Sequence, residues 1–243
     1  MRNIWVIAQR EYKLYFASPV AYIMALGLFL ILGIIFYANL LAAVAQQSAP
    51  TVQVVIAPLV TLLLFASPAV TMRLLADEQR MGTLEILLTA PVRDWELVVG
   101  KWLGGFLFMA TLVLITWIYP ITLNILEQPG IDQGLMVTGY LGVLLIVAAF
   151  MAIGVAVSSF FSNQIATFLL TFAVFLVLWM ISYPAQAAGG TGGDLLRAID
   201  MSEHFYNSFY AGIIDLKDVI YFVSVVILGL VIGTVSIESR RWR

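Results

Sequence analysis

The most informative residues of this chain are charged. Nine of its twenty-six charged residues fall within the twenty-nine positions from Arg73 to Lys101, and long uncharged stretches flank them. Acidic and basic side chains at that density, next to apolar sequence, suit contact with a soluble partner. The only histidine, His204, has no metal-ligand cluster beside it and is expected to be a satisfied interfacial residue, and there is no cysteine. We therefore expect no catalytic residue and no metal site.

The elements that position this charged cluster are those of an integral membrane protein. Of the 243 residues, 62% are hydrophobic and only 11% are charged, and the mean hydropathy is +1.01. These values lie outside the range of soluble domains. The apolar segments use most of the chain, so residues 1–243 are expected to form one membrane domain. The net charge of -2, without a basic run, argues against nucleic acid as a partner.

Six segments are long and apolar enough to cross a bilayer as helices, which takes roughly 20 residues each. They lie at residues 19–45, 54–72, 102–126, 135–157, 165–187 and 219–237. A polar interruption at 158–164 separates the fourth from the fifth. Continuous apolar runs without strand-like alternation predict an all-α fold of six transmembrane helices.

The distribution of Lys and Arg predicts the orientation of these spans, because positive residues favour the cytoplasmic side. Ten of the twelve lie in the amino-terminal flank, in the 73–101 loop and in the carboxyl tail: Arg2, Arg10, Lys13, Arg73, Arg80, Arg93, Lys101, Arg240, Arg241 and Arg243. The connections at 46–53 and 127–133 have none. Both termini are therefore expected in the cytoplasm. The connection between the fourth and fifth spans also has none and supports this orientation only by default.

Residues 1–18 are interpreted as an amphipathic helix lying in the cytoplasmic interface. Glu11 falls on its apolar side, where an unpaired carboxylate is costly. It either meets a cation or a protein groove, or it reaches up into headgroup water. A secretory signal peptide with a cleavage site at 43–45 is the competing interpretation, but the apolar run is too long for one.

Two helix breakers, Gly82 and Pro91, divide the charged segment. Between them, residues 83–89 would place three leucines on one face of a helix and Glu85 with Thr89 on another. This short helix is suited to transmitting a push from a cytoplasmic protein. An ordinary solvated loop whose charges only set the topology explains the cluster equally well.

The flanks of that short helix are also expected to be helical. Residues 77–80 continue the end of the second span, and Asp94 is placed to cap the next helix, with Glu96 in its first turn. The predicted order is helix, break, short helix, break, helix.

The largest connection on the outer side is the cap at 188–218. Its entry AAGGTGGD is expected to be flexible, and the rest to form short amphipathic helices over the outer surface. Four aromatic residues in the cap form either an interfacial belt or a contact surface for an extracytoplasmic partner. They are Phe205, Tyr206, Phe209 and Tyr210.

The chain resembles a known family at these residues. The sequence GTLEILLTAPV, preceded by the acidic and basic cluster and followed by a helix near VVGK, is similar to the permease subunits of ABC-2 type transporters. QREYKLYFASPVAYI and the six spans extend the resemblance over the whole chain. SEHFYNSFYAGIIDLKDVIYFVS resembles the gliding-motility-type branch. The resemblance implies a six-helix transmembrane domain in the bacterial plasma (inner) membrane, with an interfacial helix and a short cytoplasmic coupling helix.

The resemblance also implies partners. The permease would form a homodimer on two copies of an ABC ATPase subunit, and gliding-type permeases pair with an auxiliary membrane protein that has a large outer domain. The residues that match the coupling motif are Glu78, Arg80, Gly82, Thr83, Glu85 and Pro91, and Glu11 matches the acidic position of the interfacial helix.

ATP hydrolysis is expected to belong to the partner. The phosphate-binding pattern G-x-x-x-x-G-K-[ST] is not met, because Trp102 follows the Gly-Lys pair and Trp95 stands in place of the leading glycine. ATP and Mg²⁺ would be bound by the ATPase, and this chain would carry no cofactor.

Other function classes compete with a permease. An ion-coupled transporter is expected to place ionisable residues at membrane depth, and the six predicted cores contain none. A non-transporting membrane scaffold, or a channel of an envelope complex, is compatible with the sequence. Neither the substrate nor the direction of its movement can be read from these apolar helices.

Overall fold

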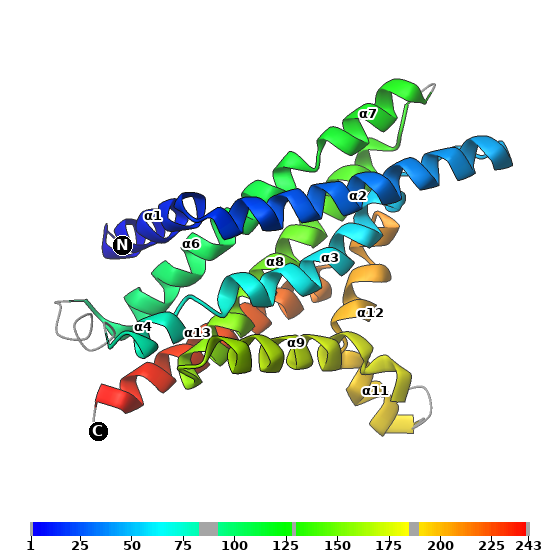
Figure 1. Ribbon diagram of the computed structural model, residues 1–243. Coiled ribbons are helices and arrows are strands. Elements are labelled where there is room, and N and C mark those ends of the chain that lie inside the picture. Colours follow the sequence, from blue (N-terminus) through cyan, green and yellow to red (C-terminus); the bar gives the residue numbers. More distant parts are fainter. Residues whose placement is uncertain (1, 83–91, 128–129, 185–189, 242–243) are drawn as a thin grey trace.

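The computed structural model describes residues 2–82, 92–127, 130–184 and 190–241, and within them the regular elements are all helices (Figure 1). Six helical segments of this described part are long and apolar enough to cross a membrane, which confirms the predicted all-α, six-span fold. They are α2 (Pro19–Gln46), α3 (Gln53–Thr71) continued by α4 (Ala76–Arg80), α6 (Asp94–Ile115) continued by α7 (Ile118–Leu126), α8 (Gln133–Phe160), α9 (Gln164–Met180) and α13 (Leu216–Arg241).

Helix α8 lies at the centre of the bundle, with α3, α6, α9 and α13 packed around it. Its most apolar stretch is 72% buried, against 17% for α9 and 22% for α2. Phe150 of α8 stacks on Phe175 of α9 with ring centroids 4.2 Å apart. The outer helices keep broad apolar faces on the surface, as expected of helices that face lipid.

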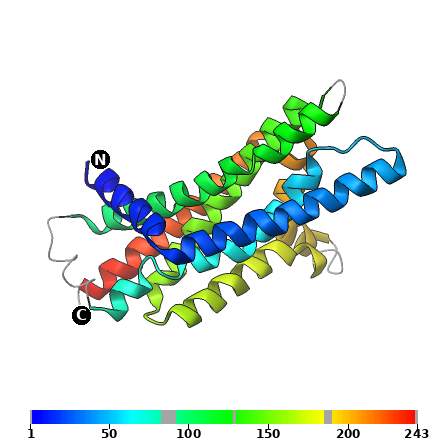
Figure 2. The same ribbon diagram turned by 45° about the horizontal axis from the view of Figure 1, so that its top comes forward.

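Small residues set the contact between α8 and α13. A Cβ added at Gly229 of α13 would lie 2.8 Å from the backbone of Ala152, and one added at Gly233 would lie 3.6 Å from the Cα of Ala156. This small-xxx-small spacing lets two helix backbones approach closely in a membrane. Helix α13 returns the chain to the end of the bundle where α1 lies, so both ends of the chain are on the same side (Figures 1 and 2).

The third span begins earlier than predicted, at Asp94 instead of Trp102. Its N-cap is Arg93, whose backbone N–H donates to Glu96 Oε2 at 3.1 Å. The prediction that Asp94 caps this helix is therefore wrong, because the Glu96 carboxylate in the first turn satisfies the backbone donor at the helix start. The last eight residues of the predicted 73–101 loop thus belong to α6.

The same span is broken between α6 and α7, where a single helix was predicted. Pro120 has no N–H to offer to the carbonyl of Thr116 one turn earlier. That carbonyl accepts instead from the backbone N–H of Tyr119 at 3.1 Å and from the hydroxyl of Tyr140, on α8, at 3.2 Å. A tighter backbone turn and a side chain from the neighbouring helix together satisfy the group that the proline leaves open.

The cap consists of α11 (Gly190–Ile199), α12 (Met201–Tyr206) and the single turn η1 (Phe209–Ala211). The glycine-rich entry was predicted to be flexible, yet from Gly190 onward it forms the first turns of α11. Tyr221 of α13 donates to the carbonyl of Ile199 at 2.6 Å, and Asp200 accepts from the backbone of Ser182 at 2.7 Å.

Candidate functional site

The N-terminal helix α1 (Arg2–Ala17) packs across the first turns of α6. Two glycines of α6, four residues apart, make this close contact possible. A Cβ at Gly104 would lie 2.6 Å from the Cβ of Glu11, and one at Gly100 would lie 2.8 Å from Ile7. Because neither position carries a side chain, α1 comes close enough to α6 to bury Glu11, which is only 7% exposed.

Glu11 belongs to a buried ion cluster with Lys101 and Glu78. Lys101 Nζ lies 3.0 Å from Glu11 Oε1 and 2.8 Å from Glu78 Oε1, and the lysine side chain is 2% exposed. The contact of Glu11 with a cation is thereby confirmed, and the alternative of headgroup water is not what the structure shows. A buried charge is tolerated only with good partners, so the cluster ties α1, α4 and α6 together.

Helix α4 is held from its other side by the last turn of α8. Ser158 Oγ accepts from the backbone N–H groups of Leu75 and Ala76 at 3.1 and 3.0 Å. Gln79 donates to the carbonyl of Ser159 at 2.8 Å. The polar interruption at 158–164 therefore does more than separate two spans, because it fixes the elbow between α3 and α4.

The residues that match the coupling motif are not all gathered in one place. Glu78 is buried in the ion cluster, whereas Arg80 is exposed at the end of α4. Gly82 follows with φ of 69°, a left-handed conformation that favours glycine, and this agrees with the predicted break. Outside the described residues lie Thr83, Glu85 and Pro91, together with the helix predicted at 83–89.

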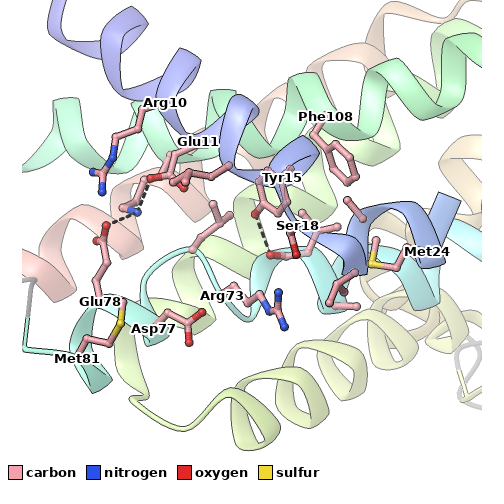
Figure 3. A pocket seen from close by; sticks show the side chains of 17 residues that line it. Arg10, Glu11, Tyr15, Ser18, Met24, Arg73, Asp77, Glu78, Met81 and Phe108 are labelled. Atoms are coloured by element: carbon pink, nitrogen blue, oxygen red, sulfur yellow. Dashed lines mark hydrogen bonds and ion pairs between the residues drawn. The ribbon is translucent and has the colours of Figure 1, made fainter.

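A cavity of about 430 Å³ lies beside the ion cluster, between α1, α2, α3, α4 and α6 (Figure 3). Its polar wall carries side chains of both signs: Arg10, Glu11, Arg73, Asp77, Glu78 and Lys101. Tyr15 also lines it and donates to the carbonyl of Val70 at 3.0 Å. Burial, and next the nearby Glu11 carboxylate, raises the pKa of Tyr15 well above its usual value, so the phenol stays neutral.

The four aromatic residues of the cap differ in how deeply they are buried. Phe205 and Phe209 are fully buried, and a Cβ on Gly142 of α8 would come within 2.4 Å of the Cβ of Phe209. These two side chains hold the cap on the bundle and offer no surface to a lipid belt or to a partner. Tyr206 and Tyr210 are half-buried, with ring centroids 5.0 Å apart. Only the exposed parts of these two side chains can contact lipid or a partner protein.

His204 also joins cap helices to the bundle. Its Nδ1 lies 2.6 Å from Asp218 Oδ1, its Nε2 lies 3.2 Å from the carbonyl of Ala198, and its ring stacks on Tyr221 at 3.9 Å. The histidine is a hydrogen-bonded residue at the end of the bundle away from the ion cluster.

The site contains residues that sequence reasoning did not single out for this role. Lys101 was counted among the residues that set topology, and Gly104 was not considered. The available signal was their spacing: Gly100, Lys101 and Gly104 all lie near the start of one helix. Only knowing that α1 folds back onto that helix makes the spacing meaningful.

The comparison with known families agrees with this architecture. The family model described as ABC-2 family transporter protein matches residues 55–191, more than half of the chain. The match runs from α3 into the first residues of α11 and includes α4, α6, α8 and α9. No curated protein matches the chain.

Proposed function

This chain belongs to the ABC-2 transporter family, and we propose that it is a permease subunit that couples ATP hydrolysis by a separate ABC ATPase to transport or to mechanical work on an envelope component. Membership of the family makes it a transporter membrane subunit with an ABC ATPase as its partner. ATP and Mg²⁺ are bound by that partner in this proposal, and the permease itself is not an enzyme.

The observation that carries the coupling proposal is the buried cluster of Glu11, Lys101 and Glu78. It links the N-terminal helix, the end of the second span and the start of the third. A displacement applied to the chain between Gly82 and Val92 reaches α4 and α6 directly, and the cluster carries it to α1. Nucleotide can shift the permease between two conformations only if the ATPase contacts them differently, and this segment is where we place those contacts.

We assign the coupling to the ATPase to the residues of the coupling motif. They are Glu78, Arg80, Gly82, Thr83, Glu85 and Pro91, with Glu11 on the neighbouring helix. Glu78 and Glu11 act from inside the ion cluster, so their part is to transmit movement. Arg80 is exposed at the end of α4, where it can reach the ATPase.

The proposed assembly is a homodimer in the bacterial plasma membrane, resting on two ATPase copies, with both chain termini in the cytoplasm. The broad apolar faces of α2 and α9 leave room for a second copy as well as for lipid. The gliding-motility-type branch, with an auxiliary protein at the outer cap, is part of the same proposal. Tyr206 and Tyr210 are the aromatic residues with surface left for that contact.

Charge reversal at Glu85 tests the coupling. We expect Glu85→Lys to weaken co-purification with the ATPase by at least about thirtyfold, because a like-charge contact in an interface costs several kcal/mol, and to abolish permease-dependent ATPase stimulation. Glu127→Lys is the matched control, since it makes the same charge change at the opposite end of the bundle.

Normal ATPase binding and stimulation in the Glu85 variant would show that this segment is not the coupling site. A scaffold or channel, the alternative function, predicts a further result: the wild-type chain would assemble with envelope proteins but would not change ATP hydrolysis at all.

A further inference from the structure

We propose that the cavity between α1, α2, α3, α4 and α6 is a phospholipid site, in which Arg73 binds the lipid phosphate and the apolar wall holds the upper part of an acyl chain. The proposal does not depend on docking of an ATPase. It rests on the chemistry of the cavity lining and on where each part of that lining lies along the membrane-spanning helices.

The polar wall offers an unmet hydrogen-bond donor. Arg73 Nε is buried and has no hydrogen-bond partner among the described residues. The neighbouring carboxylates are already engaged, since Asp77 accepts from the side-chain amide of Gln164 and Glu11 accepts from Lys101. Buried polar groups are normally partnered, so the open position in this wall calls for an acceptor.

Arg73 lines the cavity near Tyr15 and Asp77 (Figure 3). A guanidinium presents planar N–H donors that match phosphate oxygens with two parallel hydrogen bonds. The other arginine of the cavity, Arg10, is exposed on α1, so water can satisfy its donors. Arg73 is therefore the cation that we assign to the ligand.

The remaining wall is apolar and belongs to the ends of the spans. Its side chains come from the last turn of α1, the first turns of α2, the end of α3 and the middle of α6. They are Leu14, Val20, Ala21, Met24, Ala69, Val70 and Phe108. Leu14 and Val20 are 50% and 36% exposed, so the apolar wall continues to the outer surface of the bundle.

This combination selects an amphiphile. An inorganic anion would gain nothing from the apolar wall, and a purely apolar molecule would leave the Arg73 donor buried without an acceptor. A phospholipid offers both parts in the required order, because its phosphate lies at the membrane boundary and its chains extend toward the span interiors. The cavity is lined both by the amphipathic helix α1 and by the first turns of α2, where such a boundary is expected.

The experiment measures lipid binding to the full-length chain, purified in detergent, by native mass spectrometry. Dioleoyl-phosphatidylglycerol is the probe, and dioleoylglycerol is the same lipid without its phosphoglycerol headgroup. We expect the phosphate-bearing lipid to bind about tenfold more tightly than dioleoylglycerol, the difference that a charge-assisted hydrogen bond produces. Arg73→Gln should remove that preference, whereas Arg93→Gln, a matched loss of an exposed arginine at the same end, should keep it.

A second variant separates lipid from free phosphate. Ala69→Phe fills the apolar wall and leaves Arg73 in place, so it should also weaken binding of phosphatidylglycerol. Three results would each overturn the proposal: equal losses in the Arg73 and Arg93 variants, equal binding of the two lipids, or full displacement of the lipid by inorganic phosphate, which would mean that the site recognises the anion alone.

Discussion

At the scale of single residues, burial changes the role of a charged side chain. Lys101 lies in a flank that follows the positive-inside pattern, but its ammonium group is inside the protein between two carboxylates. A lysine in that position contributes to internal cohesion, because its solvation by water has been replaced by Glu11 and Glu78. Glu11 shows the same point, since an acidic residue on the apolar side of a helix is costly until a partner is found for it.

We therefore predict that Lys101→Met destabilises the protein by about 3–5 kcal/mol, because it leaves two buried carboxylates without their cation. Thermal unfolding of the detergent-purified protein would measure the loss. Lys217→Met is the control: this lysine is 73% exposed and pairs with Asp215 at the surface, so its loss should have a much smaller effect. Equal shifts in the two variants would rule out a stabilising role for the buried cluster.

At the scale of elements, glycine positions decide which helices can touch. Helix α1 packs closely on α6 at Gly100 and Gly104, and α13 packs closely on α8 at Gly229. Phe209 of the cap packs against Gly142 of α8. In lipid there is little hydrophobic drive between helices, so close packing at small residues carries much of the association. The placement of α1, and with it the ion cluster, follows from two missing side chains.

Gly104→Val tests this at the α1 contact. The added side chain meets the backbone carbonyl of Ala8 at 2.9 Å as well as Glu11, so we expect an overpacking cost of about 1–3 kcal/mol and displacement of α1. Faster tryptic cleavage after Arg10 and Lys13 would report that displacement. Gly27→Val is the matched control in α2, where nothing lies within 4 Å of the added Cβ. Unchanged cleavage in the Gly104 variant would contradict the expected displacement.

At the scale of the whole molecule, the two ends of the bundle differ in kind. One end carries both chain termini, the ion cluster and the cavity, and the other carries the compact cap of α11, α12 and η1 (Figure 1). This separation suits a machine that receives movement on one side of a membrane and presents a rigid surface on the other. The cap is anchored through Phe205, Phe209 and His204, so it should move together with α8 and α13.

The proposed orientation makes the first end cytoplasmic, and this can be checked by labelling, because the chain has no native cysteine. Single cysteines at Ser48 and Met81 lie at opposite ends on exposed positions. We expect a membrane-impermeant maleimide to label Ser48→Cys, but not Met81→Cys, in right-side-out spheroplasts. Labelling of Met81→Cys alone would reverse the assigned topology.

The sequence by itself determined the class and the number of spans. Apolar runs of about twenty residues have few alternatives to membrane helices, because backbone hydrogen bonds must be satisfied within lipid. It also located one break correctly, at Gly82, since a positive φ has a strong residue preference. Helix starts were less certain: Asp94 was the better cap by residue type, but Glu96 provides the bond in this structure.

Only the tertiary structure decided which distant residues meet. Glu11 and Lys101 are ninety positions apart, and their contact depends on how closely α1 approaches α6. The cap aromatics illustrate the same limit, because Phe205 and Tyr206 are adjacent and equally suited to a membrane interface by type, yet one is buried and the other half-exposed. A local sequence pattern indicates which environment each side chain prefers. Burial and pairing depend on how helices from distant parts of the chain pack, and the pattern of one segment does not contain that information.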